Sequence, residues 1–254
     1  MRFCDRLPPA IAVAFWTAIA IVSPTQAADS DALRKIVIDQ CVPHMQARGN
    51  PAPCASADSA AGFALLKDRS GKTQFLLIPT EPVTGIESPL ILAPGAPNYW
   101  QAAWTARHLV EGLAGRTIPR DDIGLSINSA YGRSQNQLHI HVDCIHPEIR
   151  DALRLSDAKI GAHWTDLNID LQGHRYRAMR LEGEELGTRN PFKILADGDP
   201  QAAADMGRET LSVIGAVFSD GKAGFYLLSD RAAVTTMDMA SSESLLDHDC
   251  AVLK

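Results

Sequence analysis

The sequence of 254 residues has no excess of basic residues, no CxxC motif and no low-complexity linker. Its 24 Lys and Arg against 30 Asp and Glu give a net charge of −6, which argues against a general nucleic-acid binder with a basic face. The missing CxxC pairs make a structural zinc site less favoured. Without a linker, a composition of 46% hydrophobic and 21% charged residues predicts one compact globular unit.

The chain also has no apolar run long enough to span a bilayer comfortably. Residues 10–22 form the strictly apolar core of the N-terminus, which as a helix reaches roughly 20 Å against a hydrocarbon core of about 30 Å. Two arginines precede this run, and Thr25-Gln26-Ala27 is typical of a signal-peptidase site. We expect residues 1–27 to be a cleaved signal peptide, with an uncleaved membrane anchor as the alternative, and residues 28–254 to form the exported domain.

Cysteine usage agrees with export. The exported part contains four cysteines, at Cys41, Cys54, Cys144 and Cys250. An even number in an oxidising compartment predicts two disulfides, for which three pairings exist. We favour Cys41–Cys54, which closes a short loop rich in Pro and Gly, together with Cys144–Cys250, which ties the C-terminus to a central strand. Zinc ligation is the competing interpretation.

Hydrophobic periodicity predicts an α+β fold in which helices pack on an antiparallel sheet. Strands are expected at residues 63–66, 74–78, 90–92, 123–127, 138–145, 164–169, 176–181, 213–218 and 225–228, and helices at 29–47, 98–115, 199–209 and 241–248. The hairpin sequences at residues 62–77 and 215–228 resemble each other. This similarity indicates either a duplicated, degenerate second half or the ordinary likeness of two hairpins.

One strand has an alternating pattern that indicates chemistry. Gln137, His139, His141 and Asp143 share one face, and the apolar residues between them share the other. We expect the apolar face to pack inward and Asp143 to be a solvent-facing strand end. The two imidazoles should lie about 6.6 Å apart along the strand, at roughly 3.3 Å per residue, so that both can reach one phosphate.

This pattern suits nucleotidyl transfer. A neutral imidazole can attack phosphorus and hold a nucleotidyl group covalently, and a second imidazole can protonate the departing phosphate. The polar loop before the strand supplies donors for the developing charge. The candidate substrate-binding residues are Asn128, Gly132, Arg133, Ser134, Gln135, Asn136 and Gln137. Two of these residues have an equally good alternative role. Arg133 would be a solvated turn charge instead of a phosphate contact, and Asn128 would close its turn instead of contacting the ligand.

The run from Asn128 through Gly132-Arg133-Ser134-Gln135-Asn136-Gln137-Leu138-His139-Ile140-His141 resembles the histidine-triad superfamily and, more closely, the CDP-diacylglycerol pyrophosphatase family. The similarity extends to residues 62–79, 94–100 and 247–250. It implies a histidine-triad-like fold and hydrolysis of CDP-diacylglycerol to CMP and phosphatidate. It also implies association with the bacterial inner membrane, with the catalytic domain on the periplasmic side, or free in the periplasm if the signal is cleaved. We expect no metal, no other cofactor and no nucleic-acid partner, and the oligomeric state stays open.

The sequence departs from the superfamily, which has three alternating positions, His-x-His-x-His or His-x-His-x-Gln, with the middle histidine as nucleophile. If Gln137 holds the first position, His139 attacks and His141 protonates the leaving group. If His139 is first, His141 attacks and Asp143 is third. We favour the first register, because Gly132 and Ser134 then match the superfamily's phosphate-binding glycine and serine.

Two other functions are compatible with these residues. One is a transferase, in which the covalent intermediate passes CMP to an acceptor other than water. The other is an exported lipid- or nucleotide-binding protein that keeps only a vestigial triad. Two sets of residues outside the motif are expected to be structural. His108, Trp100 and Trp104 should lie in the core, and Lys67, Asp68, Arg69 and Lys72 should form a solvated hairpin tip.

Overall fold

The computed structural model describes Met1 and residues 29–253, so the predicted signal or anchor lies outside the described residues apart from Met1. Within these residues, ten strands form one antiparallel sheet in the order β1-β2-β3-β5-β4-β8-β9-β7-β6, and β10 pairs with the end of β5. The strands are β1 (Ser56–Asp58), β2 (Phe63–Lys67), β3 (Phe75–Pro79), β4 (Ile123–Ile127), β5 (Ile140–Ile145), β6 (Thr165–Leu171), β7 (His174–Glu182), β8 (Glu209–Val217), β9 (Ala223–Arg231) and β10 (Leu246–Asp247). The predicted antiparallel sheet with packed helices is confirmed.

The two halves of the sheet have the same strand order. In the first half the order is β2-β3-β5-β4, and in the second, read from the opposite edge, it is β6-β7-β9-β8. The halves meet at the antiparallel pair β4–β8, where Oγ of Ser126 lies 2.6 Å from Oγ of Ser212. By this order β2–β3 corresponds to β6–β7, so the sequence likeness between residues 62–77 and 215–228 does not align equivalent strands.

Four helices cover one face of the sheet at the same point in each half. They are α3 (Tyr99–Thr105) and α4 (Arg107–Ala114) between β3 and β4, and α6 (Pro191–Gly198) and α7 (Pro200–Ala204) between β7 and β8. Trp100 and Trp104 are fully buried in this core, as expected, and pack edge-on against Phe192 and Phe225 respectively. His108, expected in the core, is exposed, because it lies on the outer side of α4.

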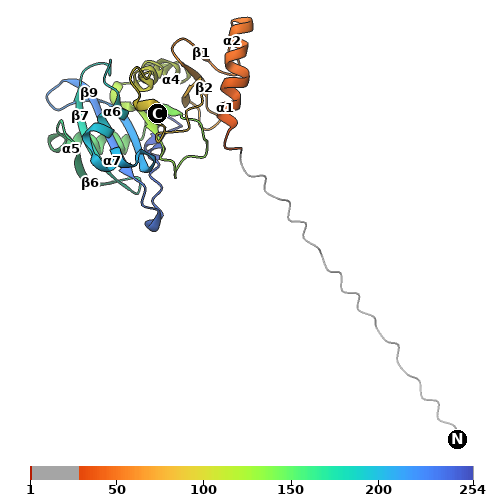
Figure 1. Ribbon diagram of the computed structural model, residues 1–254. Helices are drawn as coiled ribbons and strands as arrows, with labels where there is room; N and C mark the ends of the chain where they lie inside the picture. Colours follow the sequence, from red (N-terminus) through yellow and green to blue (C-terminus); the bar gives the residue numbers. More distant parts are fainter. Residues whose placement is uncertain (2–28, 254) are drawn as a thin grey trace.

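The opposite face holds the polar side chains of β5 and is covered by three separate segments. Helix α1 (Ala32–Ile36), a π-helical turn (Val37–Cys41) and α2 (Val42–Arg48) form the predicted N-terminal helix, which packs on β2 and β3 beside the main body (Figure 1). Helix α5 (Pro147–Ser156) covers the second half, and the C-terminal residues cover β4 and β5. Both predicted disulfides form, Cys41–Cys54 and Cys144–Cys250.

Two predicted elements are wrong, and a third is shorter than predicted. Residues 90–92 belong to a 3-10 helix (Pro89–Leu92) instead of a strand, because Pro89 occupies its first turn. The helix predicted at 199–209 ends at Ala204, and Glu209 begins β8 because its carboxylate is buried against Arg177 and Arg231. The helix predicted at 241–248 is a 3-10 turn (Ser242–Leu245) followed by β10, which pairs with β5.

The shorter 3-10 turns lie mainly at strand ends. They are Arg120–Asp122, Asp157–Lys159, Met206–Arg208, Val234–Thr236 and Ala251–Leu253. Within the described part of the chain, no helix has both the length and the apolar character needed to cross a membrane.

Candidate active site

The two histidines of the alternating strand are buried neighbours. His141 lies on β5 between β3 and β4, opposite Leu76 and Ser126, and His139 lies just before β5 begins. Their ring centroids are 4.9 Å apart in an edge-on arrangement, closer than the expected spacing along the strand because the rings lean toward each other. Both line one cavity of about 500 Å³.

The backbone fixes the tautomer of His139. Its Nδ1 lies 2.7 Å from the main-chain oxygen of Gln137. A carbonyl oxygen only accepts, so Nδ1–H donates and Nε2 keeps its lone pair. Burial lowers the pKa of His139 below its usual 6.5, and the ring is therefore neutral near pH 7. A neutral imidazole with an unprotonated Nε2 is the form that can act as a nucleophile.

His141 has the opposite tautomer. Its Nδ1 accepts a hydrogen bond from Nε2 of Gln74 at 2.5 Å, which leaves the proton on Nε2. That Nε2 is buried and has no hydrogen-bond partner among the described residues. Burial lowers the pKa of His141 to about 4, against the opposing charge of Glu243. The pair thus presents one lone pair and one N–H donor.

The C-terminal segment supplies two groups that sequence reasoning missed, Glu243 and His248. Oε1 of Glu243 is 3.4 Å from Nδ1 of His141 and 3.6 Å from Nε2 of His248, and Nδ1 of His248 is 3.0 Å from Oδ2 of Asp143. Hydrogen bonds to Asp143 and Glu243 raise the pKa of His248 to about 9. Although burial raises the pKa of Glu243, bonding to His248 and the nearby His141 bring it below its ordinary value.

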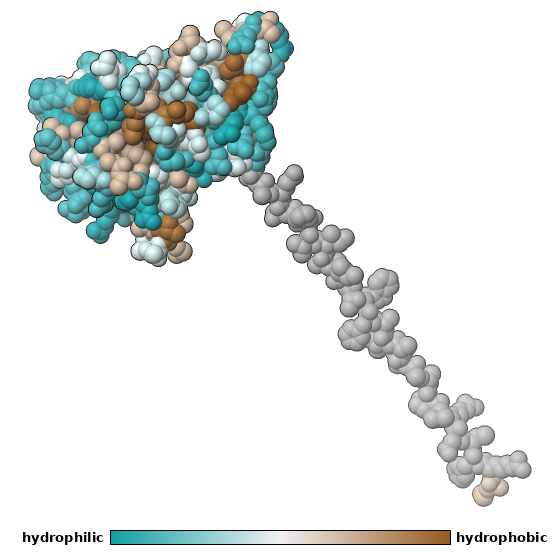
Figure 2. Space-filling view, in the orientation of Figure 1, coloured by the Kyte–Doolittle hydropathy of each residue, from teal (hydrophilic) through white to brown (hydrophobic). Residues whose placement is uncertain are grey.

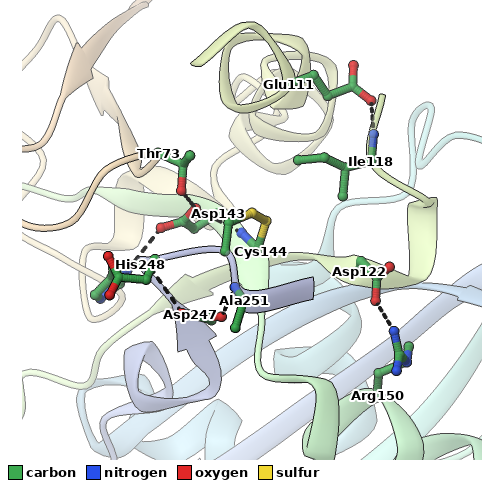
Figure 3. Close-up of a disulfide and its surroundings, with 12 residues drawn as sticks. Thr73, Glu111, Ile118, Asp122, Asp143, Cys144, Arg150, Asp247, His248 and Ala251 are labelled. Atoms are coloured by element: carbon green, nitrogen blue, oxygen red, sulfur yellow. Dashed lines mark hydrogen bonds and ion pairs between the residues drawn. A yellow bond between two sulfur atoms is a disulfide. The ribbon is translucent and has the colours of Figure 1, made fainter. Parts of the chain in front are cut away.

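The prediction that Asp143 faces solvent is wrong. Its side chain is fully buried, because the C-terminal segment lies over this face, held by β10 and by the disulfide at Cys144. Oδ1 of Asp143 accepts from Oγ1 of Thr73 at 2.6 Å, and Figure 3 shows Thr73 and His248 both directed toward this carboxylate. The predicted Cys144–Cys250 bridge was the signal that could have placed His248 beside the histidine strand.

The cavity collects most of the predicted substrate-binding residues. It is lined by Asn128, Gly132, Ser134 and Gln135 together with His139, His141 and Glu243. A Cβ on Gly132 would lie 2.9 Å from the main-chain oxygen of Met239, so the close approach of these two segments requires glycine.

Three predicted residues do not line the cavity. Both terminal nitrogens of Arg133 donate to the carboxylate of Glu87, at 2.5 and 2.7 Å, and its side chain is only 10% exposed, so it is not a solvated turn charge. Phosphate contact by Arg133 stays a prediction. Gln137 donates through Nε2 to the carbonyls of Pro79 and Glu81, and the main-chain oxygen of Asn136 accepts from Arg34.

The rest of the cavity wall divides into a charged and an apolar part. The hairpin residues Lys67, Asp68 and Arg69, expected to be solvated, line it with Ser70, whereas Lys72 pairs with Asp249 at 3.2 Å. The apolar part consists of Ala32, Leu33 and Ile36 from α1 together with Pro53, Leu66 and Leu76. One cavity therefore has cations, polar loop atoms and an apolar wall, which suits a ligand with an anionic and a hydrophobic part.

Among residues 29–253, two groups bring three potential metal ligands together. One contains the disulfide-bonded Cys144 and Cys250 and so has no free thiolate. The other contains His174, whose Nδ1 lies 3.1 Å from Asp230 and 3.0 Å from Asp238. Neither group contains His139 or His141.

The comparisons with known proteins agree with the resemblance seen in the histidine strand. A profile of the CDP-diacylglycerol pyrophosphatase family matches residues 28–254. A curated relative from Yersinia pestis, named CDP-diacylglycerol pyrophosphatase, is 43% identical over 236 residues, which cover 93% of this chain and 90% of the relative. Since both matches span nearly the whole chain, the protein belongs to the CDP-diacylglycerol pyrophosphatase family.

Proposed function

We propose that the protein hydrolyses CDP-diacylglycerol to CMP and phosphatidate through a covalent CMP–His139 intermediate. Family membership supports the reaction and substrate. The observation that carries the mechanism is the pair of complementary tautomers: the Gln137 carbonyl keeps the proton of His139 on Nδ1, while Gln74 keeps that of His141 on Nε2. One imidazole can attack and the other can donate, which favours the first of the two registers.

The reaction has two displacements at one phosphorus. In the first, Nε2 of His139 attacks the phosphorus next to cytidine and the bond to the phosphatidate oxygen breaks. His141, protonated at Nδ1 by solvent for this step, gives its Nε2 proton to that oxygen. In the second, water attacks the same phosphorus, His141 takes a proton from the water, and the phosphorus–nitrogen bond breaks. CMP is released, Nδ1 of His141 returns its proton to solvent, and both imidazoles are back in their starting forms. Loop donors and the cations Lys67 and Arg69 stabilise the phosphate charge.

The fold supports a histidine-triad-like domain with a degenerate second half. The matching strand orders make β9 the counterpart of β5. The sequence of β9 contains no histidine, so the second half would have kept the sheet and lost the catalytic pair. Its role would then be to complete the sheet along β4.

We also propose that the domain is exported and works at a membrane surface. The lipid part of the substrate, the two disulfides and the apolar cavity wall support this location. The loop around Val234, Met237 and Met239 adds exposed apolar side chains, and Figure 2 shows brown apolar atoms at the end of a projecting loop. Ser129, which follows the cavity residue Asn128, bonds to the main-chain oxygen of Met239, so this loop adjoins the site.

The test is hydrolysis of CDP-diacylglycerol in detergent micelles in water enriched in oxygen-18. Attack on the cytidine-side phosphorus places the label in CMP, and an acid-free quench with intact-mass analysis reveals a CMP adduct on the protein. Label in phosphatidate would contradict the nucleotidyl-histidine mechanism. An added alcohol that forms a CMP ester faster than water forms CMP would identify a transferase instead.

A further inference from the structure

The carboxylate of Glu243 lies between two histidine rings in the cavity wall, 3.4 Å from His141 and 3.6 Å from His248. Its other oxygen accepts from Nδ2 of Asn128 at 3.0 Å, and its main-chain N–H donates to Oδ1 of the same side chain at 3.1 Å. Two hydrogen bonds to one amide hold the carboxylate in a single orientation. Glu243 is therefore aimed at Nδ1 of His141 before any substrate arrives.

His248 extends this contact to a second buried carboxylate. Its Nδ1 lies 3.0 Å from Asp143, and Asp143 is itself held by Thr73 and by the main-chain N–H of Cys144 at 2.9 Å. The disulfide of Cys144 fixes the other end of the segment that carries His248. The order of contacts is thus Asp143, His248, Glu243, His141.

The charges of these four contacting side chains do not cancel in the free enzyme. Asp143 and Glu243 provide two carboxylates, and His248 provides one imidazolium, since both carboxylates contact it. One negative charge therefore remains beside His141. Two further groups act on the His141 ring: His139 lowers its pKa and Asp68 raises it.

We propose that Glu243 is a positioning residue that enables His141 to act as the proton donor, by holding Nδ1 and balancing the charge of the protonated ring, while His248 and Asp143 hold Glu243 in place. This inference rests on the proposed function. Burial alone keeps His141 neutral, and a neutral ring cannot give up Nε2–H without forming an imidazolate. A proton taken up from solvent at Nδ1 beside Glu243, and returned to solvent after CMP leaves, makes the ring an imidazolium whose Nε2 proton can pass to the leaving phosphate.

The side chain of Gln74 fits both forms of the ring. In the neutral form its Nε2 donates to Nδ1, and its Oε1 is buried without a hydrogen-bond partner among residues 29–253. Rotation of the amide by half a turn would present Oε1 to a protonated Nδ1. The amide can therefore follow the proton without leaving its place.

The experiment compares Glu243→Gln with wild type on two substrates. Glutamine keeps the size and the bonds to Asn128 but removes the charge. With CDP-diacylglycerol, we expect kcat to fall by about 10²-fold with little change in KM, within the usual range for a lost general acid. With the p-nitrophenyl ester of CMP, whose leaving group needs no proton, adduct formation should stay within about threefold of wild type. In a His141→Ala background, Glu243→Gln should add less than about twofold.

Glu209→Gln is the matched control, because Glu209 is a fully buried, ion-paired carboxylate away from the cavity. It should lower the melting temperature without changing the ratio of the two substrates' rates. Equal losses on both substrates, or additivity with His141→Ala, would overturn the inference and make Glu243 merely structural. If Glu243→Gln does not fold, His248→Gln takes its place, with a smaller loss in the same substrate pattern. Absence of CMP release by the wild type would contradict the proposed function instead.

Discussion

Nδ1 of His139 donates to the main-chain oxygen of Gln137, two residues earlier in the chain, at 2.7 Å. The acceptor is a peptide oxygen, so the tautomer of His139, the proposed nucleophile, depends on the path of the backbone and not on the side chain at position 137. A sequence with only two alternating histidines can therefore keep the His139 ring oriented. The Gln137 side chain instead joins the end of β3 to the loop after it.

Substitution of the two histidines should therefore have different effects on adduct formation. His139→Ala removes the attacking nitrogen, so we expect no CMP–protein adduct under any quench condition. His141→Ala should still form the adduct slowly, with a loss of about 10²–10⁴-fold that largely disappears on the p-nitrophenyl ester. Quenched intact-mass analysis of both variants is the measurement. An adduct on His141 that persists in His139→Ala would show that the second register is correct.

His248 should stabilise the protein in a defined pH window. Its folded pKa of about 9 lies above the unfolded value of 6.5. Its contribution is thus complete below pH 6.5 and is lost as the pH rises through about 9. We expect the melting temperature of wild type to exceed that of His248→Gln at pH 6, and the difference to shrink by pH 10. A difference that grows with pH would contradict the pairing with Asp143 and Glu243.

The two disulfides should affect different properties. Replacing Cys144 and Cys250 by serine frees the segment that carries Glu243 and His248, so His141 loses the carboxylate that enables it to act as the proton donor. We expect kcat to fall by at least about tenfold with CDP-diacylglycerol. The Cys41→Ser/Cys54→Ser variant should lose about 2–5 kcal/mol of unfolding free energy. The ratio of its rates on CDP-diacylglycerol and on the p-nitrophenyl ester of CMP should stay that of wild type. Denaturant unfolding and two-substrate kinetics separate these effects.

Without reductant, the wild-type mass should be lower than that of the reduced protein by the four hydrogens of two disulfides.

The apolar wall should select for the lipid. Ile36→Glu places a charge on the α1 surface that lines the cavity, so KM for long-chain CDP-diacylglycerol should rise by about tenfold or more. The p-nitrophenyl ester of CMP, which has no acyl chain, should be turned over at nearly the wild-type rate. Met45→Glu on α2 is the control, since Met45 is already 40% exposed and does not line the cavity. A uniform loss on both substrates in Ile36→Glu would argue against a lipid-binding role for this wall.

Hydrolysis should survive chelation. A histidine nucleophile aided by Lys67, Arg69 and the loop amides can neutralise the phosphate charge without a divalent ion. We expect CMP release with excess EDTA to match the untreated rate. Loss of activity that a single divalent ion restores would contradict the metal-free mechanism.

The local features of this protein follow from its sequence alone. The two-residue period of a strand places His139, His141 and Asp143 on one face wherever the strand lies. Four cysteines after the expected signal segment predicted two disulfides, and the favoured pairing is the one that forms. Asn98 and Gly115 bound a helical segment as expected, since Asn98 accepts from the N–H of Gln101 and Gly115 has a φ of 70°.

The environment of those residues was decided only by the tertiary structure. The local pattern of residues 241–248 predicts a helix, yet β10 pairs with β5, about a hundred residues earlier in the chain. This pairing buries Asp143 and places Glu243 and His248 beside the strand that carries the two histidines. The same holds for Lys67 and Arg69, whose hairpin borders the cavity because α1 and the C-terminal segment form its other walls. A periodic pattern records which side chains share a face, whereas the segment that covers that face depends on long-range strand pairing, which no local pattern encodes.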